Sequence, residues 1–218
     1  YRVQNNQSTE LVSPQMTNSL EWLKTKLYTD ASYEYNFGKF KATLGLPISY
    51  NYISYEDHTK GFEQSLNRLF VNPSLSLKYQ TGVENYVTAN YGYNNDLGGI
   101  DDVYRGTILK NYRSLFANDA PITERKSQSV GAGFNFRKAM QMFFLNFNAS
   151  YSTSTVNTIS SYNLTNNIQQ RVVILLANDV KSLAFGANAS KYLFNLRSTV
   201  NAGFSYSQNT FEQLQNNV

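Results

Sequence analysis

The stretch "SVGAGFNFRKAMQMFFLNFNASYS", residues 129–152, alternates apolar and polar side chains in two runs that a few residues separate. Side chains two positions apart on a β-strand share one face, so each run can be divided into two faces. The apolar faces carry Val130, Ala132, Phe134 and Phe136 in the first run, and Phe143, Leu145, Phe147, Ala149 and Tyr151 in the second. The opposite faces carry mostly Ser, Gly and Asn. This pattern predicts a β-hairpin that turns at 137–140.

The same pattern occurs in three more segments. They span 24–50 with a turn at Gly38, 74–93 with a turn near Gly82, and 183–206 with a turn at 191–193. Apolar faces rich in Phe, Tyr and Leu again lie opposite faces that are mostly Ser, Thr, Asn and Gly. Together the segments predict an all-β, antiparallel sheet of about eight strands in four hairpins.

The connections between these hairpins are long, whereas the turns inside them are short. We expect the long connections at 56–69, 94–127 and 157–170. Tight turns at one end and long loops at the other are typical of outer-membrane barrels, which have an apolar outside and a polar lumen. The apolar faces also carry aromatic residues at both ends, about 9 to 11 residues apart, as a tilted strand needs to cross a bilayer.

A soluble β-sandwich is the alternative architecture. Its apolar face would point inward and its outer face would be rich in Lys and Glu, whereas the polar faces here carry small neutral groups that suit a hydrated lumen. The sequence therefore predicts an antiparallel transmembrane β-barrel segment of about eight strands.

Two charged residues test this prediction, because alternation from Leu183 places Lys181 and Asp179 on the lipid-facing side. A charge at the middle of a bilayer costs about 2 to 4 kcal/mol, so both should lie above the membrane. Either the strand continues outward through 171–180, with its apolar run 172–177 packed on both faces, or a bulge near Asn178 changes the alternation.

Composition excludes several functions. The longest apolar run is six residues, Val172 to Ala177, and cannot form a membrane helix. There is no cysteine, and the net charge of +4 is spread thinly, which argues against disulfides, thiolate metal sites and nucleic-acid partners. The single histidine, His58, has no second His or Cys to complete a metal site. We expect no catalytic residues, no metal, no cofactor and no enzyme activity.

We expect residues 1–218 to form a single β-barrel segment, with 1–20 and 209–218 as polar loop ends of an internal piece of a longer protein. The long loop 94–127 is the main candidate for function. Its residues 100–109 could form a short helix with Asp101 or Asp102 at the N-terminus.

This loop has two interpretations. It could simply pack over the barrel mouth, or it could form a ligand-contacting surface, because Tyr and Arg give large contacts and directed hydrogen bonds to glycans or peptides. The candidate ligand-binding residues are Asp101, Asp102, Tyr104, Arg105, Tyr112 and Arg113.

Four segments resemble a known family: "NPSLSLKYQ" (72–80), "GIDDVYRGTILKNYRSL" (99–115), "ERKSQSVGAGFNFRKAMQMFFLNFNASYS" (124–152) and "LAFGANASKYLFNLRSTVNAGFSYSQNTFEQLQN" (183–216). They are similar to the barrel of Bacteroidetes outer-membrane proteins related to TonB-dependent receptors. The resemblance implies an internal fragment of a barrel of about 22 strands, in a protein that also has a plug and a small β-domain. It implies the lipid bilayer and, through a plug absent from this chain, the TonB system as partners, with a surface lipoprotein as a further candidate.

Three functions remain open. The leading one is a receptor in the outer membrane of a Gram-negative cell, with barrel strands as scaffold and extracellular loops that capture nutrients for import. The alternatives are a surface adhesion or assembly barrel without transport, and a self-contained small barrel of eight strands, the minimum in this class. Pairing of the first strand with the last would identify the small closed barrel.

Overall fold

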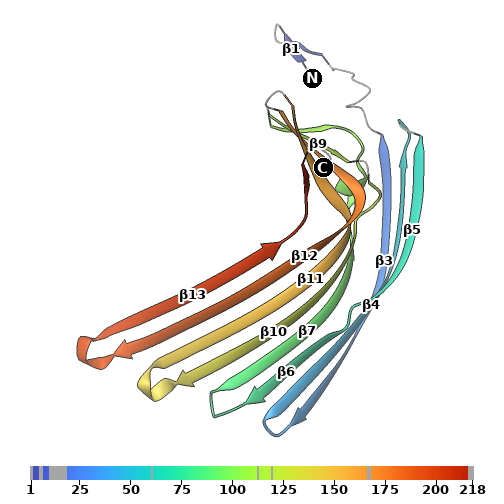
Figure 1. The fold of residues 1–218 in the computed structure, drawn as a ribbon. Coiled ribbons are helices and arrows are strands. Elements are labelled where there is room, and N and C mark those ends of the chain that lie inside the picture. Colours follow the sequence, from blue (N-terminus) through green and yellow to red (C-terminus); the bar gives the residue numbers. More distant parts are fainter. Residues whose placement is uncertain are drawn as a thin grey trace.

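The computed structural model describes residues 2–4, 7–9, 19–59, 61–111, 113–118, 120–165 and 168–215. Eight long antiparallel strands form one curved wall and follow one another in chain order (Figure 1). They are β3 (Leu20–Phe37), β4 (Phe40–Asp57), β6 (Ser74–Gln80), β7 (Tyr86–Leu97), β10 (Glu124–Lys138), β11 (Phe143–Thr165), β12 (Ile168–Leu193) and β13 (Ser198–Thr210). The pairs β3–β4, β6–β7, β10–β11 and β12–β13 are the four predicted hairpins, so the predicted all-β barrel segment is confirmed.

The short turns lie together at one end of the wall. Gly38 turns β3 into β4 with a φ of 56°, a backbone conformation that favours glycine. The turns after β10 and β12 are single 3-10 turns, η1 (Ala139–Gln141) and η2 (Phe194–Leu196), each followed by a left-handed residue, Met142 or Arg197. The last turn lies three residues later than predicted, because β12 runs to Leu193.

The pairing register places all the predicted apolar faces on one side of the sheet. One row of partners crosses the whole wall: Tyr35, Ala42, Leu77, Ala89, Ala132, Ala149, Phe185 and Tyr206. A slip of one residue in any pair would interrupt this face, so the continuous row indicates a strongly specified register. Large apolar side chains on this apolar face are exposed, including Leu27 at 64% and Phe204 at 63%. Such a face suits contact with hydrocarbon.

The two outer strands of the wall are open edges. Within the described residues, β3 pairs only with β4 and β13 only with β12. Figure 1 shows these strands at opposite margins of the curve. The first-to-last pairing that a closed eight-stranded barrel requires is thus not formed in the part of the chain that the structure describes.

The strands continue well beyond the segments predicted from alternation. β4 extends to Asp57 and pairs with β5 (Phe62–Val71), and β11 and β12 pair from end to end. The residues 56–69 and 157–170, which were predicted to be loops, are therefore mostly strand. Both predictions were wrong, because polar residues such as Ser, Thr and Asn are also common on strands outside a membrane. The loop at 94–127 contains a one-turn helix, α1 (Ile100–Val103), and two short strands, β8 (Ile108–Asn111) and β9 (Ser114–Asn118).

The chain ends also contain short strands. β1 (Arg2–Gln4) pairs with β2 (Gln7–Thr9), within the stretch expected to be loop. β14 (Leu214–Gln215) pairs in parallel with β11, and β9 pairs in parallel with β12. No helix of the described residues has the length and apolar character needed to cross a membrane.

A bulge separates the lower and upper parts of the β11–β12 hairpin. Val156 pairs with Asn178 but Thr158 pairs with Leu175, so two residues of β12 face one residue of β11. Both predicted possibilities hold, because the strand continues outward and also carries a bulge. The expectation that 172–177 packs on both faces is wrong, since Leu175 is 62% exposed.

The charged pair Lys181 and Asp179 lies outward of Tyr151 on the apolar face. Lys181 pairs with Thr153, and the Thr155 hydroxyl donates to the Asp179 carboxylate at 2.7 Å. The apolar face thus becomes polar at Thr153, two residues beyond Tyr151 on the same strand. This agrees with the expectation that the two charges lie above the membrane.

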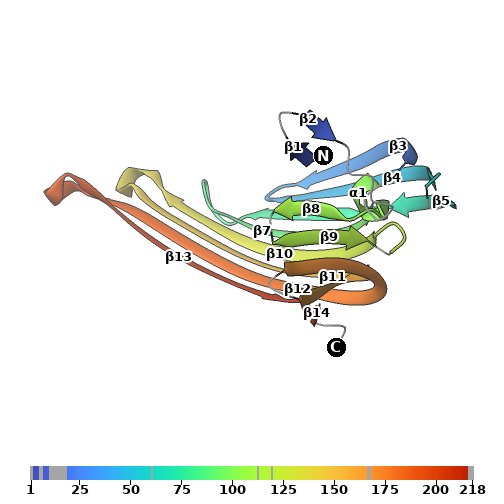
Figure 2. The same cartoon turned by 90° about the horizontal axis from the view of Figure 1, so that it is seen from above.

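The hydrophobic core lies at the loop end. Ile53 and Tyr55 point to the side of β4 opposite the apolar face, where they pack with Leu97, Val103 and Ile122. Partly buried side chains of β3 and β5 surround this cluster, including Trp22, whose ring stacks on Tyr55 at 5.9 Å. Figure 2 shows α1, β8 and β9 between the β3–β5 strands and the β10–β12 strands. The core therefore holds the long loop on the lumen side of the wall.

Candidate functional site

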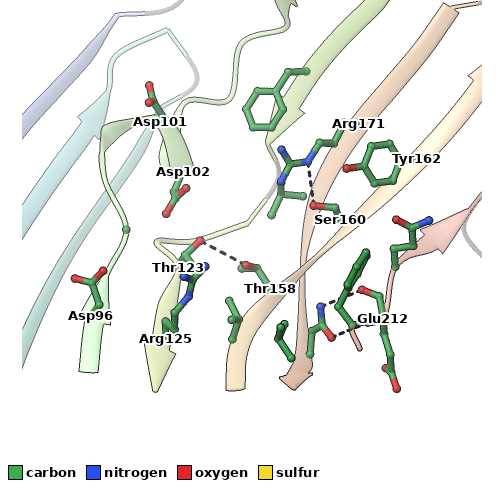
Figure 3. A pocket seen from close by; sticks show the side chains of 18 residues that line it. Asp96, Asp101, Asp102, Thr123, Arg125, Thr158, Ser160, Tyr162, Arg171 and Glu212 are labelled. Atoms are coloured by element: carbon green, nitrogen blue, oxygen red, sulfur yellow. Dashed lines mark hydrogen bonds between the residues drawn. The ribbon is translucent and has the colours of Figure 1, made fainter. Parts of the chain in front are cut away.

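A cavity of about 590 Å³ opens at the loop end of the wall, on the face opposite the apolar face (Figure 3). Its buried floor is formed by Val156, Thr158 and Val173 from β11 and β12. The long loop and the residues after β13 complete its rim through Asp101, Asp102, Phe116 and 211–213. A pocket of this size is in the range of small-molecule sites.

Charged groups of both signs line the cavity. Four are carboxylates and two are guanidinium groups: Asp96, Asp101, Asp102, Glu212, Arg125 and Arg171. Asp96 and Arg125 are cross-strand partners on β7 and β10. Among the described residues, no ion pair within 4.0 Å joins any two of these six groups. In Figure 3 the three aspartates lie on one side of the pocket and Arg171, Ser160 and Tyr162 on the other.

Arg171 is held in place by two neighbours. Its Nε donates a hydrogen bond to the Ser160 hydroxyl at 3.0 Å, and its guanidinium carbon lies 5.3 Å from the centre of the Phe116 ring. These residues come from β12, β11 and β9, so the parallel pairing of β9 with β12 brings the ring to the cation. A guanidinium oriented in this way presents its terminal nitrogen atoms in a fixed plane.

Two asparagines attach crossing segments to the β11–β12 hairpin. Asn178 donates to the backbone carbonyl of Glu212 at 3.0 Å and accepts from its N–H at 3.3 Å. Asn157, opposite the bulge, donates to the carbonyl of Ile122 at 3.3 Å and accepts from the N–H of Glu124 at 2.9 Å. The Asn157 amide therefore contacts the end of the long loop, and the Asn178 amide contacts the segment after β13. Both segments border the cavity.

Of the predicted ligand-contacting residues, Asp101 and Asp102 line the cavity. The Asp102 carboxylate lies so close to Gly98 that a β-carbon at this glycine would collide with it. Tyr104 instead lies over Gly106, and Arg105 lies 3.9 Å from the centre of the Phe62 ring, beside the core.

Arg113, a further candidate, does not line the cavity. Arg113 is exposed at the β8–β9 turn, where its N–H donates to Asn111 and its carbonyl accepts from Gln169. Tyr112 lies outside the described residues. The five described candidates are therefore divided between the cavity, the core and the loop tip.

The predicted helix is shorter than expected. α1 covers one turn with Gly99 at its N-cap, and neither Asp101 nor Asp102 makes a side-chain cap hydrogen bond. The chain enters β8 at Ile108 rather than continuing the helix. Both carboxylates lie in the first turn of α1 and line the cavity.

Several cavity residues were not among the predicted candidates. Tyr162 and Ser160 lie on a strand extension within 157–170, which the sequence suggested to be loop, and Arg171 lies at the start of the predicted outward extension 171–180. Arg171 and Tyr162 are direct cross-strand partners, but their pairing depends on the bulge. Because a bulge is not visible in a polar and apolar alternation, only the isolated Arg beside an apolar run could have signalled this position.

Three groups at the loop end of the wall have shifted pKa values. Burial raises the pKa of Tyr55, partly offset by a hydrogen bond from the Ile122 backbone and by the charge of Arg105. The hydrogen bond with Glu21 and the charge of Glu56 raise the pKa of His58. Ion pairing with Glu124 raises the pKa of Arg68.

The described residues contain no group of three or more His, Asp or Glu side chains arranged to hold a metal ion. The cavity residues instead offer charge pairing and hydrogen bonding from carboxylates, guanidinium groups and hydroxyls. Such a set suits binding of a polar solute.

Comparison with known proteins identifies similar folds only. The FrpB iron transporter from Neisseria meningitidis matches in its F3-3 variant with a TM-score of 0.54 and 18% identity over 90% of this chain. Its F5-1 variant matches with a TM-score of 0.51 and 17% identity, also over 90% of this chain. The chain spans 27% and 28% of those two proteins.

No protein-family model matches the sequence, and no curated protein matches it. At identities this low, the structural similarity concerns the fold alone. The chain has the fold of a segment of an outer-membrane transporter barrel.

Proposed function

We propose that this chain forms part of the barrel wall of an outer-membrane receptor of the TonB-dependent type, and that its loop end captures a nutrient for import. The proposal depends chiefly on one observation: a single apolar face runs in register across eight strands, and a charged cavity opens on the opposite face at the loop end. The first feature suits a bilayer, and the second suits a solute that arrives from water.

The proposed partners follow from the two faces and the two edges. Outer-membrane lipid would cover the apolar face, and further strands of the same barrel would pair with the open edges of β3 and β13. Energy would come from the TonB system through a plug on the lumen side. The surface lipoprotein and the Bacteroidetes origin stay predictions, and transport rather than catalysis is the expected activity.

Single cysteines on neighbouring positions test the orientation of the wall, since the 218 residues contain none. Phe147 belongs to the apolar face and Asn146 to the lumen face of β11. In outer membranes carrying the intact protein, Asn146→Cys should react with a water-soluble maleimide and Phe147→Cys should not. Equal reaction at both positions would contradict a membrane-facing apolar side.

Uptake tests the import role separately. Cells that lack the gene should accumulate fewer small solutes from a dilute, isotopically labelled complex medium than cells that carry it, and a protonophore should abolish the difference. Correct orientation of the wall without any difference in uptake would instead favour the adhesion or assembly barrel.

A further inference from the structure

We propose that the apolar face binds one phospholipid of net negative charge at its short-turn end. Lys138 and Lys191 would hold the phosphate group, and an acyl chain would lie in a groove along β12. This inference rests on the proposed function in taking the apolar face as the side that lipid covers. It adds the chemical class of one bound lipid and its position on the wall.

The two lysines lie on one row of the sheet. Lys138 ends β10, Lys191 belongs to β12, and both are direct cross-strand partners of Phe143 on β11. Two strand spacings of about 4.8 Å place the Cα atoms of the lysines about 10 Å apart. Each ammonium group ends a flexible four-carbon stem, so both groups can reach one phosphate group above Phe143.

An aromatic pair lies beneath the two ammonium groups. The Lys138 Nζ lies 5.7 Å from the centre of the Phe136 ring, and the Lys191 Nζ lies 5.8 Å from the centre of the Phe143 ring. The two rings are in edge contact, with their centres 5.8 Å apart. A cation at such a distance is attracted to the ring face, which favours these side-chain positions over extension into water.

No negative charge balances the two lysines on this part of the apolar face. From the turns to Tyr151, the other apolar-face positions of β10–β13 carry Phe, Leu, Tyr, Val, Ala and Ser. The turns η1 and η2 add Arg197 but no carboxylate. Among the described residues, no ion pair within 4.0 Å includes Lys138 or Lys191. A ligand at this position should therefore be an anion.

The other half of the wall differs at the same end. Its apolar face ends in one uncharged row: Phe37, Phe40, Tyr79 and Val87. Lys78 lies on the opposite face of β6, with its Nζ 4.0 Å from the centre of the Tyr86 ring. The lysine pair is thus a local feature of β10 and β12 rather than a general border of the apolar face.

A groove of about 230 Å³ begins next to this pair on the same face. Small residues of β12 and β13 form its floor between larger neighbours, and its apolar-face lining is Leu145, Ala187, Ala189, Ala202 and Phe204. Ala189 is two residues from Lys191 on β12, or about 7 Å along the strand. The groove therefore lies on the side of the lysines that is farther from the turns.

This order matches the direction of a phospholipid in a bilayer. Short turns of outer-membrane barrels face the periplasm, so the lysines would meet headgroups of the periplasmic leaflet. An acyl chain would then run from the headgroup toward the middle of the membrane, over Ala189 and Ala187. A free phosphate ion could use the charges but not the groove.

The test uses the intact protein in a non-ionic detergent and native mass spectrometry, which resolves each bound lipid. Phosphatidylglycerol should bind at least about fivefold more tightly than phosphatidylethanolamine, whose ammonium group cancels the charge of its phosphate. Excess inorganic phosphate should not displace the lipid, because it lacks the acyl chain.

Charge variants assign the headgroup position. Lys138→Gln and Lys191→Gln should each weaken phosphatidylglycerol binding about fivefold and leave phosphatidylethanolamine binding nearly unchanged. Lys191→Arg keeps the charge and should retain the affinity. Lys78→Gln is the matched control, because it removes the same charge from the opposite face near the same end.

Groove variants assign the acyl chain. Ala189→Leu fills the groove and should weaken the binding of both lipids by about fivefold. Ala149→Leu makes the same change at a half-buried alanine of the apolar face outside the groove and should have no effect. Retained migration of the folded form on unheated gels identifies variants that remain assembled.

Four results would overturn the proposal: equal binding of the two lipids, unchanged phosphatidylglycerol binding in both lysine variants, displacement by inorganic phosphate, or equal effects of Ala189→Leu and Ala149→Leu. None of these results would alter the cysteine labelling or the uptake difference described above. Failure of the lipid assignment is therefore distinguishable from failure of the proposed receptor.

Discussion

Arg68 of β5 and Glu124 of β10 form a two-point ion pair, with Nη2 2.6 Å from Oε1 and Nε 3.1 Å from Oε2. Their strands are not hydrogen-bonded to each other, because β5 pairs with β4 and β10 pairs with β7 and β11. The Glu124 N–H also donates to Asn157. Glu124, at the end of the long loop, thus connects the β4–β5 hairpin with the bulge of β11.

Arg68→Met should loosen this connection without changing the wall. Arg68 and Glu124 are partly exposed, so we expect a loss of only about 1 kcal/mol, which corresponds to about fivefold faster hydrogen exchange at the amides of 120–124. Lys41→Met is a matched control, because Lys41 forms a 2.7 Å pair with Glu34 near the short turns. Equal hydrogen exchange at 120–124 in both variants would contradict the proposed role of the Arg68–Glu124 ion pair.

His58 should respond to pH through its two carboxylate neighbours. Its Nε2 lies 3.2 Å from Glu21 and its Nδ1 lies 3.1 Å from Glu56, and only the protonated ring donates from both nitrogen atoms. Because its folded pKa is raised, chiefly by Glu21 and then by Glu56, the stabilising contribution is present below the ordinary value of about 6.5 and is lost as pH rises through the raised pKa.

An NMR titration of the imidazole checks this prediction. Glu21→Gln should lower the pKa of His58 toward its ordinary value, whereas Glu84→Gln, at a short turn on the opposite end of the wall, should leave it unchanged. The backbone N–H of His58 donates to the Ser19 carbonyl, and its amide hydrogen should exchange more readily above the raised pKa of the side chain. A titration unaffected by Glu21→Gln would contradict the pairing.

The wall could be predicted from the sequence because each of its strands separates two different environments. Alternation on β11 from Phe143 to Tyr151 has one meaning, lipid on one face and water on the other, and the observed register agrees with it. All four hairpins follow from this rule alone. Only the exact turn residues, such as Phe194 in η2, were misplaced.

The loop end could not be predicted in the same way. On β4, Tyr52 belongs to the apolar face while neighbouring Ile53 and Tyr55 point into the core, so both faces read as apolar. The bulge opposite Asn157 changes which residues of β12 face the cavity. The parallel pairing of β9 with β12 joins segments more than 50 residues apart, and alternation carries no information on such contacts.

An arginine on the apolar face should be far more costly than one on the lumen face. Phe147→Arg is expected to destabilise the folded barrel by about 2 to 4 kcal/mol in lipid, since the guanidinium would face hydrocarbon. Asn146→Arg, on the adjacent position, faces open cavities on the lumen side and should have little effect. Urea unfolding of the intact protein in bilayers measures both, and equal losses would contradict the assigned faces.

Asn178→Ala should free the segment that follows β13 from the cavity rim. The variant loses both hydrogen bonds to Glu212, and removing such bonds costs about 1 to 3 kcal/mol. We expect chymotrypsin to cleave after Phe211 about tenfold faster, while Asn188→Ala, on the same strand and face, should cleave at the original rate. Unchanged cleavage in Asn178→Ala would show that β14 alone holds the segment.

Ile122→Ala should detach the long loop from the core before the wall unfolds. Ile122 is 3% exposed and packs with Tyr55 and Val103, and truncation of a buried isoleucine costs about 2 to 5 kcal/mol. Because Trp22 stacks on Tyr55, the fluorescence emission of Trp22 should shift to longer wavelength at a lower urea concentration in Ile122→Ala than in the unchanged protein. The Trp22→Phe variant gives the background fluorescence. Val83→Ala, at a turn position that is 94% exposed, should leave this transition in place. A Trp22 transition that stays coincident with loss of strand circular dichroism in Ile122→Ala would mean that loop and wall unfold as one unit.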